Sequence, residues 1–139
     1  MRPGEAYRLL HGSSLALEAA FPATTRAPEA ARRALDGFAA ALPDEVRFNV
    51  RLLVSELVAN AVRHAGAGGD GQIRVTARTG PQRVHVEVSD DGEGFDWRSL
   101  PPNGDGGRGL PLVAALADRW GLTFEGGTTA WFELRHTHD

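Results

Sequence analysis

The stretch from residue 44 to residue 65 constrains the fold most, because it is typical of a helix that is apolar around most of its circumference. Such a helix is stable only when other elements cover it on several sides. A polar seam of Glu56, Asn60 and His64 interrupts it, and a spacing of four keeps these side chains nearly in line. Glu and Asn are costly to bury unless a partner satisfies them. The seam therefore indicates either a solvated face or a bound ligand. The apolar positions around it are Leu53, Val54, Leu57, Val58, Ala61 and Val62.

The rest of the chain supplies elements that can cover this helix. Apolar and polar residues alternate in two stretches around a short "GPQ" turn, which predicts a β-hairpin. The predicted order is a strand at 13–21, helices at 24–42 and 44–65, strands at 72–79 and 83–90, a glycine-rich segment at 91–109, a helix at 110–120, and a closing hairpin from 121–127 and 129–135. This order predicts an α+β fold, a two-layer sandwich of a mixed, mostly antiparallel sheet with helices on one face.

Length and composition narrow the classes of protein. A chain of 139 residues predicts one domain, 1–139, with its core at about 13–135. The formal net charge of −3 argues against direct binding of nucleic acid or an anionic membrane. The absence of cysteine excludes disulfides, thiolate catalysis and cysteine-ligated metals. No signal peptide or membrane-spanning run is seen, so the expected location is the cytoplasm.

Two more polar clusters accompany the seam. In "SDDGEG", a valine-rich strand ends at Asp90, followed by Gly92 and Gly94. An Asp there is either a turn former or a buried acceptor for an exocyclic amine, with the glycines leaving room for a flat ring. In "GDGGRGL", residues 104–110 lead directly into a predicted helix. Glycines and a helix N-terminus favour an anion site, and a plain Gly-rich loop is the alternative. In the seam, Glu and Asn one turn apart can hold Mg²⁺ or place a base beside a phosphate.

In this order and at these distances, the clusters resemble the ATP-binding boxes of the GHKL superfamily. "ELVANAVRHA" is similar to its N box, "DDGEGF" to its DxGxG box, "GGRGL" to its second glycine box, and "GGTTAWFEL" to its last box. Within that superfamily the chain most resembles bacterial anti-sigma factor serine kinases, especially in "VSELVANAVRHA" and "GGRGLPLVAALADRWG". The resemblance covers about residues 15 to 135 and implies the Bergerat-type ATP-binding fold.

The resemblance also implies roles for single residues. Glu56 matches the general base, Asn60 the Mg²⁺ ligand, and Asp90 the acceptor of the adenine amino group. Thr129 matches a threonine near the adenine. Many members carry Lys before it, where this chain has Thr128, so ATP binding is implied more directly than kinase activity. The remaining residues assigned to the ATP site are Arg63, His64, Gly92, Gly94, Gly104, Gly106, Gly107, Arg108, Gly109 and Leu110.

The function implied by the resemblance is regulatory. The chain would be an ATP- and Mg²⁺-dependent serine/threonine kinase that binds a sigma factor and phosphorylates an anti-sigma factor antagonist. Two alternatives stay open: an ATP-binding switch that sequesters a partner without phosphorylating it, and a stand-alone histidine-kinase-like catalytic domain. The resemblance implies a homodimer, and we expect exposed apolar side chains at Leu15, Leu17 and Phe21 to contribute to it.

Overall fold

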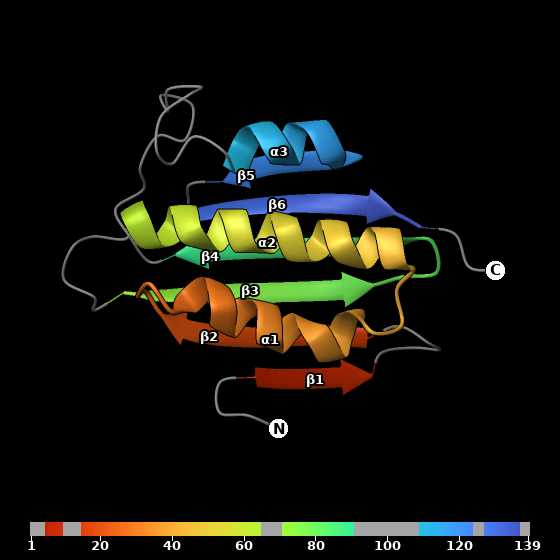
Figure 1. The fold of residues 1–139 in the computed structure, drawn as a ribbon, viewed down its shortest axis with the longest axis horizontal. Helices are drawn as coiled ribbons and strands as arrows, with labels where there is room; N and C mark the ends of the chain where they lie inside the picture. Colours follow the sequence, from red (N-terminus) through yellow and green to blue (C-terminus); the bar gives the residue numbers. More distant parts are fainter. Residues whose placement is uncertain (1–4, 10–14, 65–70, 91–108, 124–126, 137–139) are drawn as a thin grey trace.

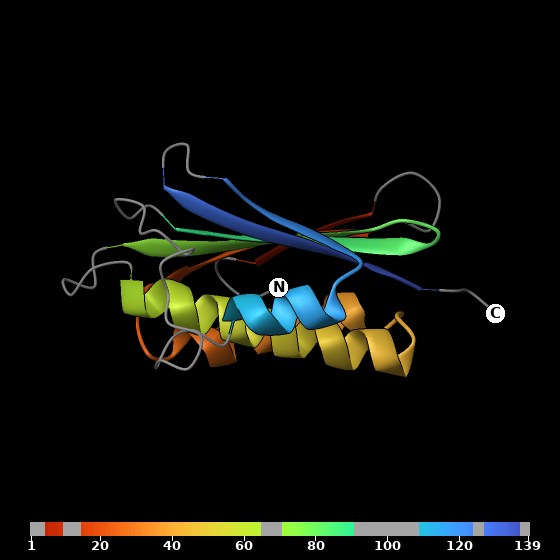
Figure 2. The same ribbon diagram turned by 90° about the horizontal axis from the view of Figure 1, so that it is seen from above.

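The computed structural model describes residues 5–9, 15–64, 71–90, 109–123 and 127–136. They form two layers, a twisted sheet and a layer of three helices that covers one of its faces (Figures 1 and 2). The predicted α+β sandwich is therefore confirmed. The elements in chain order are β1 Glu5–Leu9, β2 Leu15–Pro22, α1 Ala27–Ala39, α2 Asp44–His64, β3 Gln72–Thr79, β4 Arg83–Asp90, α3 Gly109–Leu116, β5 Arg119–Thr123 and β6 Thr128–Arg135.

The six strands lie in the order β1-β2-β3-β4-β6-β5, and every pairing between them is antiparallel. The expectation of a partly mixed sheet was therefore wrong for the described strands. Three neighbouring pairs, β1–β2, β3–β4 and β5–β6, follow one another in sequence, and consecutive strands joined by short connections run antiparallel. At the β3–β4 turn the Gly80 amide donates to the Arg83 carbonyl at 2.7 Å, which closes the predicted hairpin.

The core lies between the two layers, with α2 at its centre. The α2 side chains that recur at helical spacing, among them Val50, Leu57 and Ala61, are buried, as the sequence predicts. Alternate residues of the strands meet them from the sheet side, including Val86 and Phe132. The apolar surface of the helix predicted at 44–65 is thus covered by the sheet on one side and by α1 and α3 on the others.

Polar contacts join α1 to α2 on the outer side of the helix layer. The Arg32 guanidinium donates to Ser55 Oγ at 3.2 Å, and that hydroxyl donates to the Arg51 carbonyl at 2.7 Å. Arg51 also pairs with Asp36 at 3.2 Å. Exposed pairs of this kind each stabilise a fold by only about 0–1 kcal/mol. The buried apolar face, rather than these contacts, therefore holds the two helices together.

The predicted boundaries between the third helix and the closing hairpin were wrong. The helix expected at 110–120 ends at Leu116, and β5 begins at Arg119. There the Asp118 amide donates to the Glu133 carbonyl at 2.9 Å, and Trp120 lies opposite Phe132 on β6. Pairing with the sheet edge thus overrides the local helical pattern. β1 was not predicted from the sequence; it is a short edge strand that has only β2 to pair with.

Two of the apolar residues expected on a dimer surface are buried. Leu17 is 1% exposed and Phe21 is 8% exposed, because both point from β2 into the core under the helices. Neither is therefore free to contact a second copy. Within the described ranges, no helix is both long and apolar enough to cross a membrane.

Candidate functional site

Three elements end or begin at one end of the molecule, on the helix-covered side of the sheet. The last turns of α2 reach this end, β4 finishes there with Asp90, and β6 starts there with Thr128 (Figure 1). In the β4–β6 register, Asp90 lies directly opposite Thr128. Directly opposed residues of an antiparallel pair point to the same face. The carboxylate and the hydroxyl therefore share the face on which α2 packs.

Buried polar side chains concentrate at this end. In the part of the chain that the structure describes, four polar side chains are buried, and three belong to these elements. Asn60 on α2 is 2% exposed, Asp90 is 7% exposed and Thr128 is 1% exposed. The fourth, His136, follows the far end of β6. Burying a polar side chain is costly, so core packing alone does not explain why polar residues occupy these positions.

At this end of the fold, Asn60 Nδ2 and Thr128 Oγ1 are buried without a hydrogen-bond partner among the described residues. A buried polar atom left unpaired costs about 1–3 kcal/mol. A half-turn of the amide exchanges its oxygen and nitrogen, so Asn60 can offer a donor or an acceptor at the same place. The arrangement fits a ligand that supplies hydrogen-bonding groups or a cation to this end of the fold.

The two adjacent threonines of β6 lie on opposite faces of the sheet. On β6 the side chains alternate, and Thr128, Ala130, Phe132 and Leu134 are those that point toward the helices. Thr129 points to the opposite, open face, opposite Ser89. The threonine that shares a face with Asp90 is therefore Thr128, the position at which many members of the resembled family carry Lys. The period of two along "TTAWFELR" carries this information, because Phe132 and Leu134 fix which face is inward.

Glu56 lies one helical turn before Asn60 on α2 and is half-buried, so its carboxylate stays within reach of solvent or substrate. Arg63 is exposed near the end of the helix. His64 is its last residue, and its side chain lies outside the described part. Of the seam, the structure thus describes Glu56 and Asn60, one half-buried and one buried.

Most of the predicted glycine boxes fall on residues that the structure does not describe. The segment between β4 and α3 is outside the described ranges, so its assigned residues stay predictions: Gly92, Gly94, Gly104, Gly106, Gly107 and Arg108. Gly109 and Leu110 form the first turn of α3, which packs against α2. The helix that follows the second glycine box thus borders the element that carries Asn60.

A metal in this site would depend on the nucleotide. Across the described ranges, no three His, Cys, Asp or Glu side chains cluster closely enough to hold a metal ion. Mg²⁺ often takes only one or two protein ligands and completes its shell with phosphate oxygens and water. An Asn side-chain oxygen is a suitable ligand of this kind. The donor set at this end therefore fits Mg²⁺ that arrives with a phosphate-bearing ligand.

Comparison with known proteins decides the family. The family model of the histidine kinase-like ATPase domain matches residues 21–133, from β2 into β6. The chain belongs to this family. The match to the histidine kinase-like ATPase domain confirms the predicted GHKL resemblance, and it spans Glu56, Asn60, Asp90 and Thr128.

Among relatives of this histidine kinase-like ATPase domain, the serine-protein kinase RsbW of Staphylococcus epidermidis is 33% identical over 94 residues. The match covers 57% of this chain and 59% of that kinase. The chain therefore spans somewhat more than half the length of this relative. The predicted resemblance to bacterial serine kinases is confirmed at this level.

Two solved structures share the fold of the family. The histidine kinase domain of the Erythrobacter litoralis EL346 blue-light activated histidine kinase has a TM-score of 0.55 and 24% identity. It covers 77% of this chain and 58% of that domain. The Erythrobacter litoralis EL346 kinase itself has a TM-score of 0.54 and 29% identity, over 67% of this chain and 31% of that one. Both support the arrangement of helices on one face of the sheet.

Proposed function

We propose that the protein is an ATP- and Mg²⁺-dependent serine/threonine kinase that regulates transcription. In this proposal it acts as an anti-sigma factor in the cytoplasm, binds a sigma factor, and phosphorylates an anti-sigma factor antagonist. Membership of the histidine kinase-like ATPase family and the likeness to a serine-protein kinase support it. The observation that carries it is the buried set of Asn60, Asp90 and Thr128 beside half-buried Glu56.

The residues divide the work as their chemistry suggests. Asp90 is a carboxylate, which accepts hydrogen bonds, so it suits the amino group of adenine. Thr128, opposite it on β6, adds a hydroxyl that can donate or accept. ATP supplies the phosphoryl group and binds together with Mg²⁺, for which Asn60 is the protein ligand. Glu56, one turn away, is the base that takes the proton of the incoming serine or threonine hydroxyl.

In phosphoryl transfer a protein chiefly positions groups and neutralises charge. A rigid scaffold is therefore the main requirement, and α2 meets it because most of its circumference is buried. One helix holds both the proposed base and the proposed metal ligand, so their spacing is fixed by helical geometry. The antiparallel pair β4–β6 fixes Asp90 against Thr128 in the same way.

Asp90→Asn tests the base-recognition part of the proposal. We expect it to weaken ATP binding more than tenfold, since the loss of a hydrogen bond to a charged group costs about 1.5–3 kcal/mol. The amide keeps the side chain's size but removes the negative charge that strengthens the hydrogen bond from the adenine amino group. Calorimetric titration with ATP and Mg²⁺ measures the effect. Asp36→Asn, at an exposed carboxylate on α1, is the matched control and should bind like the unmodified protein. An Asp90→Asn protein with unchanged affinity would defeat this role.

A second candidate function is an ATP-binding switch that sequesters a partner without phosphorylating it. The observation that favours it is Thr128, a buried hydroxyl where the family resemblance places a lysine in many members. Glu56 separates the two candidates, because nucleotide binding alone needs no base. The proposal also includes a homodimer, which light scattering at high micromolar concentration tests. A monomer with and without ATP would contradict that part alone.

A further inference from the structure

The face of the sheet away from the helices is an ordered grid of side chains. The registers align its residues in cross-strand rows, of which the first is Ala16–Arg78–His85–Glu133–Arg119 and the second Glu18–Thr76–Glu87–Trp131–Gly121. We call this surface the open face. Five strands spaced about 4.8 Å apart and about 26 Å long give it roughly 600 Å². That approaches the roughly 800 Å² that each partner buries in a standard protein–protein interface.

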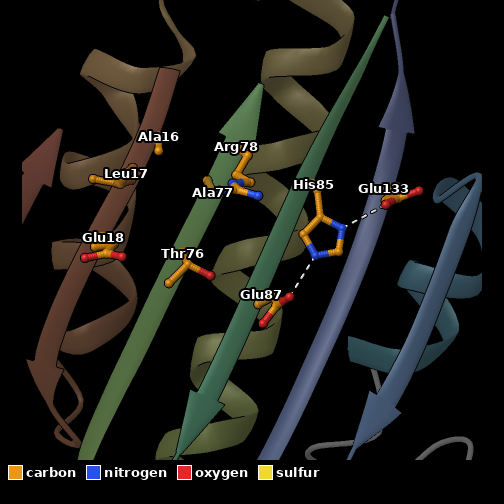
Figure 3. Close-up of a pocket in the computed structure, with 9 residues that line it drawn as sticks. All are labelled: Ala16, Leu17, Glu18, Thr76, Ala77, Arg78, His85, Glu87 and Glu133. Atoms are coloured by element: carbon orange, nitrogen blue, oxygen red, sulfur yellow. Dashed lines mark hydrogen bonds and ion pairs between the residues drawn. The ribbon is translucent and has the colours of Figure 1, made fainter. Parts of the chain in front are cut away.

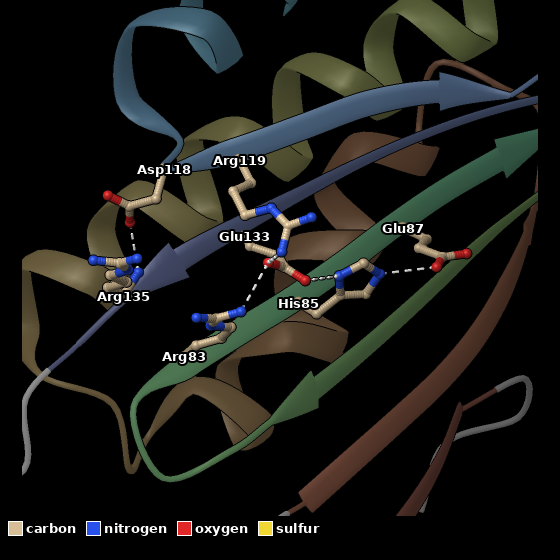
Figure 4. A network of polar contacts seen from close by, with 7 residues as sticks. All are labelled: Arg83, His85, Glu87, Asp118, Arg119, Glu133 and Arg135. Carbon is tan, nitrogen blue, oxygen red and sulfur yellow. Dashed lines mark hydrogen bonds and ion pairs between the residues drawn. The ribbon is translucent and has the colours of Figure 1, made fainter.

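An aromatic pair stands at the centre of the open face. The rings of His85 and Trp131 stack with centroids 5.5 Å apart and planes inclined by 24°. The indole lies across Gly121 on β5, where an added Cβ would come within 2.6 Å of its Nε1. Carboxylate oxygens of Glu133 and Glu87 lie 2.9 and 2.8 Å from the two ring nitrogens of His85 (Figures 3 and 4). A half-buried tryptophan is therefore fixed in one position on a surface that no helix covers.

Small residues beside this pair leave a hollow in the open face. Ala16 and Thr76 lie on its floor, and its volume is about 590 Å³ (Figure 3). Glu18 stands on its β2 side, and Arg78 on β3 flanks it. The open face is therefore not flat at this place. His85, on whose ring Trp131 stacks, lines this hollow, so the aromatic pair and the hollow together give the surface a relief that side chains of a partner can fill.

Positive charges outnumber negative charges around the aromatic pair. The open face carries five arginines against three glutamates, a net charge of +2 with His85 neutral, whereas the whole chain carries −3. All five arginines are exposed: Arg74, Arg78, Arg83, Arg119 and Arg135. Two of the glutamates already have cationic or histidine partners. Glu133, 16% exposed, pairs with Arg83 at 3.5 Å and with Arg119 at 3.7 Å, and Glu87 contacts His85 (Figure 4).

Three of the five arginines lie at the end of the sheet remote from Asp90, whereas Arg74, opposite Ser89, lies near Asp90. Arg83 begins β4, Arg135 ends β6 and Arg119 begins β5. Arg83 and Arg135 lie directly opposite each other in the register. Like charges in that position repel, so the pair is a site that a negative group stabilises.

We propose that the open face is a docking surface for a protein partner that presents carboxylate side chains. The partner contacts the His85–Trp131 pair at its centre and places its acidic groups opposite the arginines that begin β4 and β5 and end β6. Aromatic centres with charged rims are the usual anatomy of such surfaces. This inference goes beyond the proposed function and does not depend on it, because the surface lies on the opposite side of the sheet from Asn60 and Asp90.

The test uses Trp131 as its own reporter. In the full chain with Trp97→Phe and Trp120→Phe, Trp131 is the single tryptophan, and its emission is followed during titration with short poly-L-glutamate. We expect a saturable change that weakens as salt rises, and no saturable change with poly-L-lysine. Arg83→Gln with Arg135→Gln should reduce the affinity about tenfold, since two exposed ion pairs are lost.

The matched control is Arg33→Gln with Arg51→Gln, which removes two exposed arginines from the helix layer. Its affinity should equal that of the parent protein. Equal weakening in both double variants, or no response to poly-L-glutamate, would overturn the proposal. A response to phosphatidylserine vesicles but not to poly-L-glutamate would assign the surface to a membrane instead. A change of Trp131 emission with protein concentration alone would assign it to a second copy of the chain.

Discussion

Glu56→Gln is expected to reduce phosphoryl transfer about 10²–10⁴-fold, the usual effect of removing a general base. The amide keeps the shape of the side chain but cannot take the proton of the attacking hydroxyl. ATP affinity should change little, because Asp90 and Asn60 are untouched. Labelled phosphate on the antagonist protein and calorimetric ATP binding, measured on the same preparations, give the two quantities. Glu45→Gln, an exposed glutamate at the other end of the same helix, is the matched control.

Asn60→Ala distinguishes the base from the metal ligand. It should weaken ATP binding and transfer together, because the proposed Mg²⁺ ligand is lost. If Glu56→Gln transfers phosphate as fast as the unmodified protein, the assignment of the base is wrong. If the unmodified protein binds ATP but transfers nothing to its antagonist, the ATP-binding switch becomes the better account.

Phe132→Ala is expected to destabilise the fold by about 3–5 kcal/mol, as large-to-small changes of a buried aromatic do. Phe132 is fully buried on β6, between the sheet and α2. The same change at Phe48, which is 67% exposed on α2, should shift stability by no more than about 0.5 kcal/mol. Chemical denaturation of both variants, followed by circular dichroism, measures the difference. Similar losses at the two positions would contradict the assignment of the core.

Hydrophobic periodicity predicted correctly those helices and strands whose type is determined by a single local pattern. The helix at 44–65 and the strands at 72–79 and 83–90 were expected within a residue of the observed α2, β3 and β4. Each has one face that must be buried, so its sequence alone fixes its type. The start of β5 and the whole of β1 were missed, because edge strands are selected by pairing with a neighbour, which a local window does not contain.

The candidate site divides in the same way. The sequence left open whether Asn60 and Asp90 are solvated or buried, and the structure shows both to be buried. Thr128 was not assigned, although the alternation of Ala130, Phe132 and Leu134 along β6 already places it on the inward face. Its pairing with Asp90, 38 positions earlier in the sequence, needs the sheet register, which no local pattern contains. Family resemblance assigns a motif to a segment, whereas the direction of each side chain within it follows from the fold.

The same register has a consequence for the order of folding. The hairpins β3–β4 and β5–β6 join neighbours in sequence, whereas β2–β3 and β4–β6 close long loops. Closing a long loop has an entropic cost that local pairs avoid, so the hairpins are expected to form before the long-range pairs. Asp90 and Thr128 lie on the β4–β6 pairing, which forms after the two hairpins that it joins. The proposed adenine site is therefore absent from any intermediate that lacks β4–β6, and only the fully assembled sheet can bind the nucleotide there.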